Sequence, residues 1–245
     1  MRFVMVVLFS SVLLTGCAIS PIPKNVATMH VQSRADFDAL RPHVQVGDVI
    51  FRLGATKVAG GLLDFSKTVA SMSDSDFSHA CVVLQADDIM VADITMYGIE
   101  RRFFRDWYIS GTENVVVKRL RPEYRDLIPK VMGTLDELID QDVLYNVEFS
   151  DNGNKFYCTE VVDHIFRVNG APLADRMRIR DMPHYNVFVA FCCLVGGIDA
   201  DQEIVVAGNE EIGLFSSPML ETVVDLRDGH AGPAAVAKLA QVASP

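Results

Sequence analysis

The order of apolar runs along the chain constrains the fold more than any other feature of the sequence. Four runs with the composition of β-strands come first, at 46–53, 77–84, 89–95 and 114–120. Two runs whose apolar residues recur at helical spacing follow, at 121–139 and 158–168. Strands that are followed by helices, instead of alternating with them, predict an α+β domain with a mainly antiparallel sheet.

Two further segments are harder to assign. Residues 57–72 have apolar side chains at helical spacing, although a Gly-Gly pair weakens a helix there. Residues 187–197 are strongly apolar, so periodicity does not choose between a strand and a buried helix. We expect Cys192 and Cys193, which are adjacent in this segment, to be buried as small apolar residues.

The composition narrows the class of protein. The 245 residues are 50% hydrophobic and 22% charged, which is enough apolar side chain for one sizeable core. The formal charge of −10 argues against a nucleic-acid partner, because phosphate binding needs a clustered basic surface. Charged stretches such as Arg101-Arg102 are typical of solvated faces. No internal run approaches the about 20 apolar residues that a membrane-spanning helix needs.

The first 17 residues have the organisation of a secretion leader. Arg2 supplies a short basic start, residues 3–14 are mainly apolar, and small residues precede Cys17. An ordinary cleaved signal or a short membrane anchor has similar features. However, Leu14-Thr15-Gly16-Cys17 resembles the lipobox of bacterial lipoproteins. This resemblance implies that Cys17 is lipid-modified, becomes the mature N-terminus and anchors the protein to a membrane. Ala18 at the next position favours the outer membrane of the bacterial cell envelope, facing the periplasm.

These features predict one folded domain behind an anchor. We divide the chain into a lipoprotein signal peptide (1–17), a polar tether (18–41), a globular domain (42–228) and an Ala/Pro-rich tail (229–245).

Cys158 is the first candidate for a catalytic residue. It lies where a polar loop turns into the predicted helix 158–168. A thiol at a helix N-terminus is close to unpaired backbone N–H groups and to the positive end of the helix dipole, and both favour the nucleophilic thiolate. The alternative is a cysteine that only packs in the first turn of the helix. Glu160 in the same turn complements the helix dipole, which favours a structural role for it.

His79 is the candidate general base. It enters a strand-like run, where an imidazole needs a partner, so a hydrogen-bonded core histidine is the alternative. Asp93 lies on the next run, and a hairpin of the two runs would let its carboxylate orient the imidazole; Glu100 is a weaker substitute. Cys81 is a rival nucleophile, but about 6–7 Å separates side chains two residues apart on a strand, which is too far for direct proton transfer from Cys81 to His79.

Common metal- and cofactor-binding motifs are absent from the sequence. The sequence has no CxxC, HxxxH or HExxH pattern, and the spacing from Cys158 to His164 matches no usual zinc site. It also lacks a GxSxG motif, a phosphate-binding P-loop and a dinucleotide-binding glycine pattern. We therefore expect neither a metal nor a cofactor, and a zinc site remains the rival use of Cys and His.

Three stretches in a fixed order carry a family resemblance. They are Val-Gly-Asp-Val-Ile-Phe-Arg at 46–52, Phe-Ser-His-Ala-Cys-Val-Val-Leu at 77–84 and Phe-Tyr-Cys-Thr-Glu-Val-Val at 156–162. Together with Tyr-Asn-Val-Glu-Phe at 145–149, this order resembles the circularly permuted branch of the NlpC/P60 cysteine peptidases, specifically the YiiX/YebB-like group. The resemblance covers roughly 46–168. It implies a papain-like α+β half-barrel, permuted so that the histidine strand precedes the cysteine helix.

The resemblance also implies roles for the candidate residues. Cys158 matches the family's nucleophile, His79 its general base, and Asp93 falls where the family has a third polar residue. The implied activity is thiol-dependent hydrolysis of an amide bond, with peptidoglycan peptides as the default substrate of an envelope protein. An acyltransferase or lipid-acting thiol enzyme is the alternative, and a non-catalytic module that binds peptides or lipids is the rival from another class.

Overall fold

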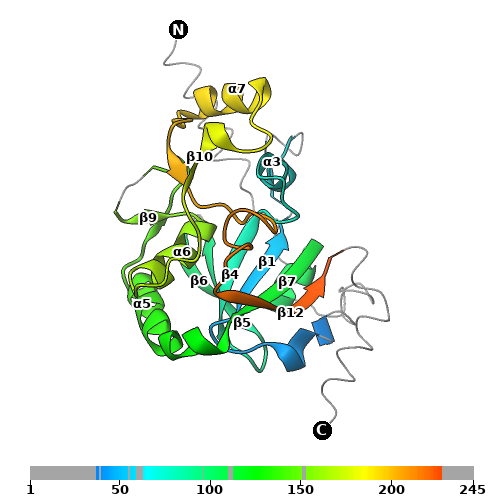
Figure 1. Ribbon diagram of the computed structural model, residues 1–245, viewed down its shortest axis with the longest axis vertical. Helices are drawn as coiled ribbons and strands as arrows, with labels where there is room; N and C mark the ends of the chain where they lie inside the picture. Colours follow the sequence, from blue (N-terminus) through cyan, green and yellow to red (C-terminus); the bar gives the residue numbers. More distant parts are fainter. Residues whose placement is uncertain are drawn as a thin grey trace.

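A six-stranded antiparallel sheet forms the centre of the molecule, with strand order β12-β7-β1-β4-β5-β6 (Figure 1). The computed structural model describes residues 37–227, apart from 39, 55, 59–62, 96, 110–112 and 151–152. The strands of the sheet are β1 (Val49–Leu53), β4 (His79–Gln85), β5 (Met90–Thr95), β6 (Gly98–Phe103), β7 (Glu113–Leu120) and β12 (Leu220–Leu226). This architecture confirms the predicted α+β class with an antiparallel sheet on helices.

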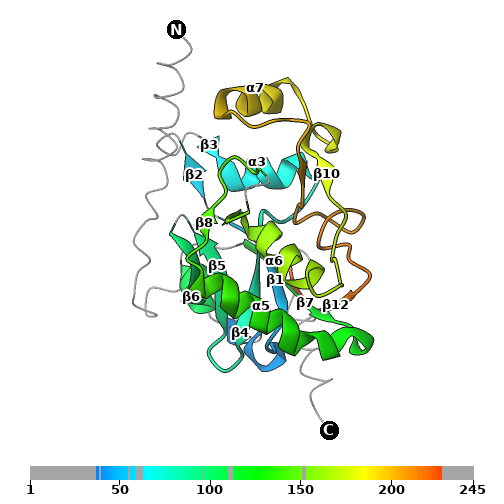
Figure 2. The ribbon, with the colours of Figure 1, turned by 90° about the vertical axis from the view of Figure 1, so that its left-hand side faces the viewer.

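One face of the sheet is covered by two helices, α5 (Ile128–Asp140) and α6 (Cys158–Arg167), which lie side by side in Figures 1 and 2. Alternate residues of the central strands point toward them, because successive side chains of a strand face opposite sides. Val49 and Phe51 of β1 pack in one cluster with Val82 of β4 and with Val162 of α6. This cluster is the main core, and it fixes where α6 begins relative to β4.

The opposite face carries a smaller cluster. Ile50, Cys81 and Val91 point to this side of the sheet. They are covered by Phe37 and Leu40, which precede the short turn η2 (Arg41–His43), and by Phe104 at the start of α4 (Phe104–Ile109).

A third group of elements lies at one end of the molecule (Figures 1 and 2). It contains α3 (Phe65–Met72), α7 (Val187–Gly196) and the short strand pair β10 (Met177–Arg178) with β11 (Glu203–Ile204). The buried side of α7 packs with Tyr157, the residue before α6. The remaining short elements are β2 (Lys57–Val58), β3 (Leu63–Asp64), β8 (Leu144–Tyr145), β9 (Lys155–Phe156), η4 (Pro122–Leu127) and η5 (Ile179–Asp181).

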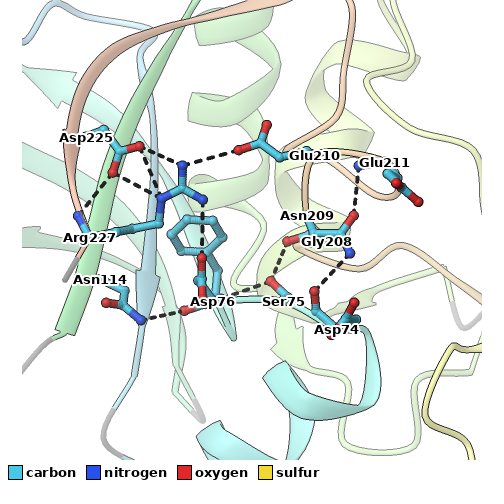
Figure 3. Close-up of polar contacts among 11 residues, drawn as sticks. Asp74, Ser75, Asp76, Asn114, Gly208, Asn209, Glu210, Glu211, Asp225 and Arg227 are labelled. Atoms are coloured by element: carbon cyan, nitrogen blue, oxygen red, sulfur yellow. Dashed lines mark hydrogen bonds and ion pairs between the residues drawn. The ribbon is translucent and has the colours of Figure 1, made fainter. Parts of the chain in front are cut away.

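The C-terminal strand holds the loop that leads into β4. Arg227, after β12, lies 2.7 Å from Asp225 and 3.2 Å from both Asp76 and Glu210 (Figure 3). In the same place the hydroxyl of Ser75 donates a hydrogen bond to the carbonyl of Gly208. The segment after 199, to which the sequence assigned no role, therefore fixes the loop three residues before His79.

Some predicted elements have different boundaries. The helix expected at 57–72 begins only at Phe65, because the side chain of Asp64 accepts a hydrogen bond from the backbone N–H of Lys67 and caps the helix there; β2 and β3 occupy its first part. The helix expected at 121–139 starts as the 3-10 turn η4 and becomes α-helical at Ile128. The strands β6 and β12 were not predicted.

The apolar segment 187–197 is a helix, one of the two predicted alternatives, but it is not fully buried. Cys193 is buried as expected, whereas Cys192 is partly exposed. The leader with Cys17, the tether up to residue 36, and the tail from 228 lie outside the described residues. Among the residues that the structure describes, no helix has both the length and the apolar character needed to cross a bilayer.

A buried ion pair joins the strand β7 to the turn before β1. The guanidinium of Arg119 contacts both carboxylate oxygens of Asp48 at 2.8 Å, and Asp48 also accepts a hydrogen bond from the backbone N–H of Gln45 at 2.7 Å. The Asp48 side chain is 1% exposed, so its charge depends on these partners.

We expect Asp48→Ala to lower the free energy of unfolding by about 3–5 kcal/mol, because it leaves the Arg119 charge buried without its carboxylate. Chemical denaturation followed by circular dichroism measures the change. Asp136→Ala is the matched control, since the Arg101–Asp136 pair is about half exposed and its loss costs less than about 1 kcal/mol. Equal losses in the two variants would contradict this assignment.

Candidate active site

The thiol of Cys158 lies at the first residue of α6, against the start of β4. Its Sγ is 3.9 Å from the carbonyl oxygen of Ser78, and the residue is 8% exposed. Tyr157 at the N-cap position makes no side-chain cap, so the backbone N–H groups of the first turn stay available to an anion. The backbone N–H groups of Ala80 and Thr159 donate toward the sulfur.

Both neighbours of Cys158 are held by the backbone of Val205. The backbone N–H of Val205 donates to the hydroxyl of Tyr157 at 2.7 Å, and its carbonyl accepts from the hydroxyl of Thr159 at 2.6 Å. Both bonds are buried, where hydrogen bonds are costly to leave unmade. Val205 therefore fixes the start of α6, and no feature of the sequence indicated this contact.

His79 and Asp93 meet across the neighbouring strands β4 and β5. The Nε2 of His79 is 2.8 Å from Oδ1 of Asp93, and their side chains are 15% and 4% exposed. The predicted hairpin of the two runs is therefore present, and it brings the Asp93 carboxylate to the imidazole as expected. Glu100, the weaker substitute, stands opposite Asp93 on β6.

The other side of the imidazole hydrogen-bonds the thiol of Cys158. Burial alone would lower the pKa of His79, but the charges of Cys158 and Asp93 outweigh it and raise the pKa to about 9. Burial alone would raise the pKa of Cys158, but His79 and the two backbone N–H groups hold it below the ordinary thiol value. Both shifts favour a thiolate–imidazolium pair over a neutral thiol and imidazole, with the carboxylate of Asp93 behind the ring.

Two arginines surround the carboxylate of Asp93. Nη1 of Arg102 is 3.4 Å from Oδ2 of Asp93, and Arg52 stands directly opposite His79 in the register of β1 and β4. Burial alone would raise the pKa of Asp93. The charges of His79, Arg52 and Arg102 outweigh burial and hold that pKa below its ordinary value, so the carboxylate stays ionised. The expectation of a solvated face at 101–102 is wrong for Arg102, whose side chain is 19% exposed. Arg52 and Arg102 were not predicted as site residues.

The remaining sequence candidates have other roles. Cys81 is fully buried and donates from Sγ to the carbonyl of Ile50 at 3.8 Å, and burial raises the pKa of its thiol well above the ordinary value. Glu160 forms an ion pair with Arg176 at 3.7 Å, in keeping with the structural role expected for it. In the part of the chain that the structure describes, no three His, Cys, Asp or Glu side chains gather as a metal site.

Comparison with known proteins identifies the family. A family model described as a permuted papain-like amidase enzyme, YaeF/YiiX, C92 family, matches residues 43–223. The chain belongs to this family. The permuted papain-like fold is thereby confirmed, while the finer placement among NlpC/P60 peptidases stays a prediction.

Solved structures share the fold of this C92-family chain. One of them is the yiiX protein of Escherichia coli O157:H7, described as a metalloprotein, with a TM-score of 0.58 and 22% identity. The match covers 75% of this chain and 98% of the other. No curated protein matches the chain in a sequence search.

We expect iodoacetamide at pH 7 to alkylate Cys158 much faster than Cys193, although the two residues are 8% and 7% exposed. The reason is that His79 lowers the pKa of Cys158, whereas burial raises the pKa of Cys193. Peptide mapping by mass spectrometry measures both rates in one sample.

The variant His79→Gln serves as the control for the source of the reactivity. It should slow alkylation of Cys158 at pH 7 by about tenfold or more, because each unit of pKa changes the thiolate fraction about tenfold. Similar rates at Cys158 and Cys193, or no effect of His79→Gln, would rule out the thiolate–imidazolium pair.

Proposed function

We propose that this C92-family protein is a thiol amide hydrolase that cleaves an amide bond of peptidoglycan peptides. The observation that carries the proposal is the buried chain of Cys158, His79 and Asp93, in which His79 lies between a thiol and a carboxylate. A nucleophile, a base and a group that orients the base are the parts that acyl transfer requires. The amidase family to which the chain belongs supports the amide bond as the target.

The proposed reaction has two halves. The Cys158 thiolate attacks the amide carbonyl carbon, and the imidazolium of His79 donates its proton to the amine nitrogen as the carbon–nitrogen bond breaks. Water then attacks the thioester while neutral His79 accepts its proton. The carboxylic acid leaves, and the thiolate–imidazolium pair is restored. Asp93, whose Oδ1 lies 2.8 Å from Nε2 of His79, orients the imidazole and stabilises its charged form.

The start of α6 provides the means to stabilise the oxyanion. The first turn has no side-chain cap, and its N–H groups lie at the positive end of the helix dipole. Negative charge that develops on the carbonyl oxygen beside Cys158 would be stabilised there. Removing one such donor typically costs about 10²–10³-fold in rate.

The substrate class follows from the proposed location. The leader implies a lipid on Cys17 and a site on the outer membrane facing the periplasm, where a tethered domain has the peptide amides of peptidoglycan within reach.

We expect purified wild-type protein to release peptide or amine products from cell-wall fragments and Cys158→Ala to release none, because the variant lacks the nucleophile. Liquid chromatography with mass spectrometry detects the products, and Cys193→Ala is the matched control that should keep full activity.

Incubation with phospholipids in parallel separates the alternatives. Release of fatty acid, or acyl transfer, by wild type without turnover of cell-wall fragments would replace the proposal with a lipid-acting thiol enzyme. No turnover of either substrate, despite a reactive Cys158, would favour a non-catalytic binding module.

We expect Asp93→Asn to move the alkaline limb of the pH–rate profile to lower pH. Activity falls at high pH when His79 loses the proton that it gives to the leaving amine, and in the wild type this occurs near the His79 pKa of about 9. The Asp93 charge raises that pKa, so its removal lowers the pKa and shifts the limb.

Glu100→Gln, which removes a carboxylate on the neighbouring strand, should leave the limb in place. An unchanged limb in Asp93→Asn, or equal shifts in the two variants, would show that Asp93 does not set the ionisation of His79.

A further inference from the structure

The helix α7 presents an apolar surface to solvent. None of its ten residues, Val-Phe-Val-Ala-Phe-Cys-Cys-Leu-Val-Gly, is charged. Val187, Phe188, Phe191 and Leu194 are 87%, 53%, 53% and 79% exposed. Their spacing places them along one side of the helix, which we call the α7 face.

The α7 face is a built feature of the fold. Asn186 caps the start of the helix by accepting hydrogen bonds from Phe188 and Val189 at 2.9 and 3.1 Å, and Gly197 ends it in the left-handed conformation with φ 72°. The opposite side of the helix is anchored, because Val189 and Cys193 are buried in a cluster of apolar side chains that also contains Tyr157. The exposed side chains are thus held outward by a capped and packed helix.

A second copy of the chain is a poor occupant for this face. A ten-residue helix is about 15 Å long and about 10 Å wide. A stable interface buries about 800 Å² on each partner, which is several times the area that such a footprint offers. A bilayer needs no matching surface, since lipid chains adapt to whatever apolar shape inserts.

The charge of the chain selects the mode of contact. With a formal charge of −10 and no cation on α7, attraction to anionic headgroups cannot hold this surface on a membrane. Burial of the four apolar side chains is the favourable contribution that remains.

The tether is long enough to permit the contact. Cys17 lies 20 positions before Phe37, the first described residue, and 20 residues reach about 65 Å when extended. A domain of this size is about 40 Å across. An anchor on Cys17 therefore leaves α7 free to reach the same bilayer, although α7 lies at the opposite end of the molecule from the turn η2 (Figures 1 and 2).

We infer that the α7 face inserts into the surface of a bilayer rich in zwitterionic lipid and orients the domain on its membrane. The inference rests on the membrane anchor of the proposed function. Val189 and Cys193, on the buried side of α7, pack in the same cluster as Tyr157, the residue before Cys158. Insertion would hold the start of α6 at a defined distance from the membrane surface.

Tryptophan quenching tests the inference with the full chain. The protein is reconstituted from detergent into phosphatidylethanolamine–phosphatidylcholine vesicles, with or without brominated acyl chains, which quench tryptophan inside the hydrocarbon. Phe191→Trp reports on the α7 face, and Tyr97→Trp reports on a residue that is 80% exposed outside it. The signal of the single native tryptophan, measured in the wild type, is subtracted from both.

We expect the emission added by Phe191→Trp to lose most of its intensity in brominated vesicles, equally at low and high salt, and that of Tyr97→Trp to be unchanged. Equal quenching of the two variants, or none at position 191, would overturn the inference. A blue shift of Phe191→Trp that follows protein concentration instead of lipid would also overturn it, in favour of a second copy.

Flotation of the same vesicles separates the inference from the anchor. Chain that floats while position 191 stays unquenched disproves α7 insertion and leaves the anchor standing. Chain that fails to float disproves both, whereas the hydrolytic activity is tested by Cys158→Ala alone.

Discussion

The site depends on one electrostatic condition: a thiol removed from water ionises only if a cation and backbone donors stand beside it. Burial opposes the charge on Cys158, and the imidazolium of His79 together with two backbone N–H groups reverses that effect. The same pairing raises the pKa of His79 to about 9, so the imidazole keeps its second proton at neutral pH. Neither residue would have these properties without the other, so the relative placement of α6 and β4 determines whether the protein has a nucleophile.

Much of the fold serves to fix that placement. Hydrogen bonds from the backbone of Val205 hold the residues on either side of Cys158, and Arg227 ties down the loop that leads to His79. Both contacts come from the last third of the described chain, which contributes no reactive side chain of its own. The C-terminal segment therefore has a structural role in the site. Val205 positions the helix that carries the thiol, and Arg227 positions the loop before the strand that carries the imidazole.

The sequence allowed the site to be predicted better than the periphery. His79 and Cys158 could be found because each stands at the start of a regular element with a clear apolar period, and the contact with Asp93 follows from a simple hairpin. Other features depend on contacts between distant segments. No local pattern indicated that the backbone of Val205 would hold the start of α6. The later start of the helix that was expected from residue 57 has a local cause instead, because Asp64 caps it at Phe65. The apolar composition of α7 predicted burial, whereas among the described residues only Val189 and Cys193 of this helix pack in a buried cluster.

Titration of the His79 imidazole by nitrogen-15 NMR tests the central claim most directly. In the wild type, we expect the ring to stay protonated until about pH 9. In Cys158→Ala the pKa should fall by at least one unit, because the thiolate is the largest of the influences that raise it. A ring that titrates near its ordinary value of about 6.5 in both proteins would show that the thiol and imidazole do not share a proton, and the account of the site would be wrong.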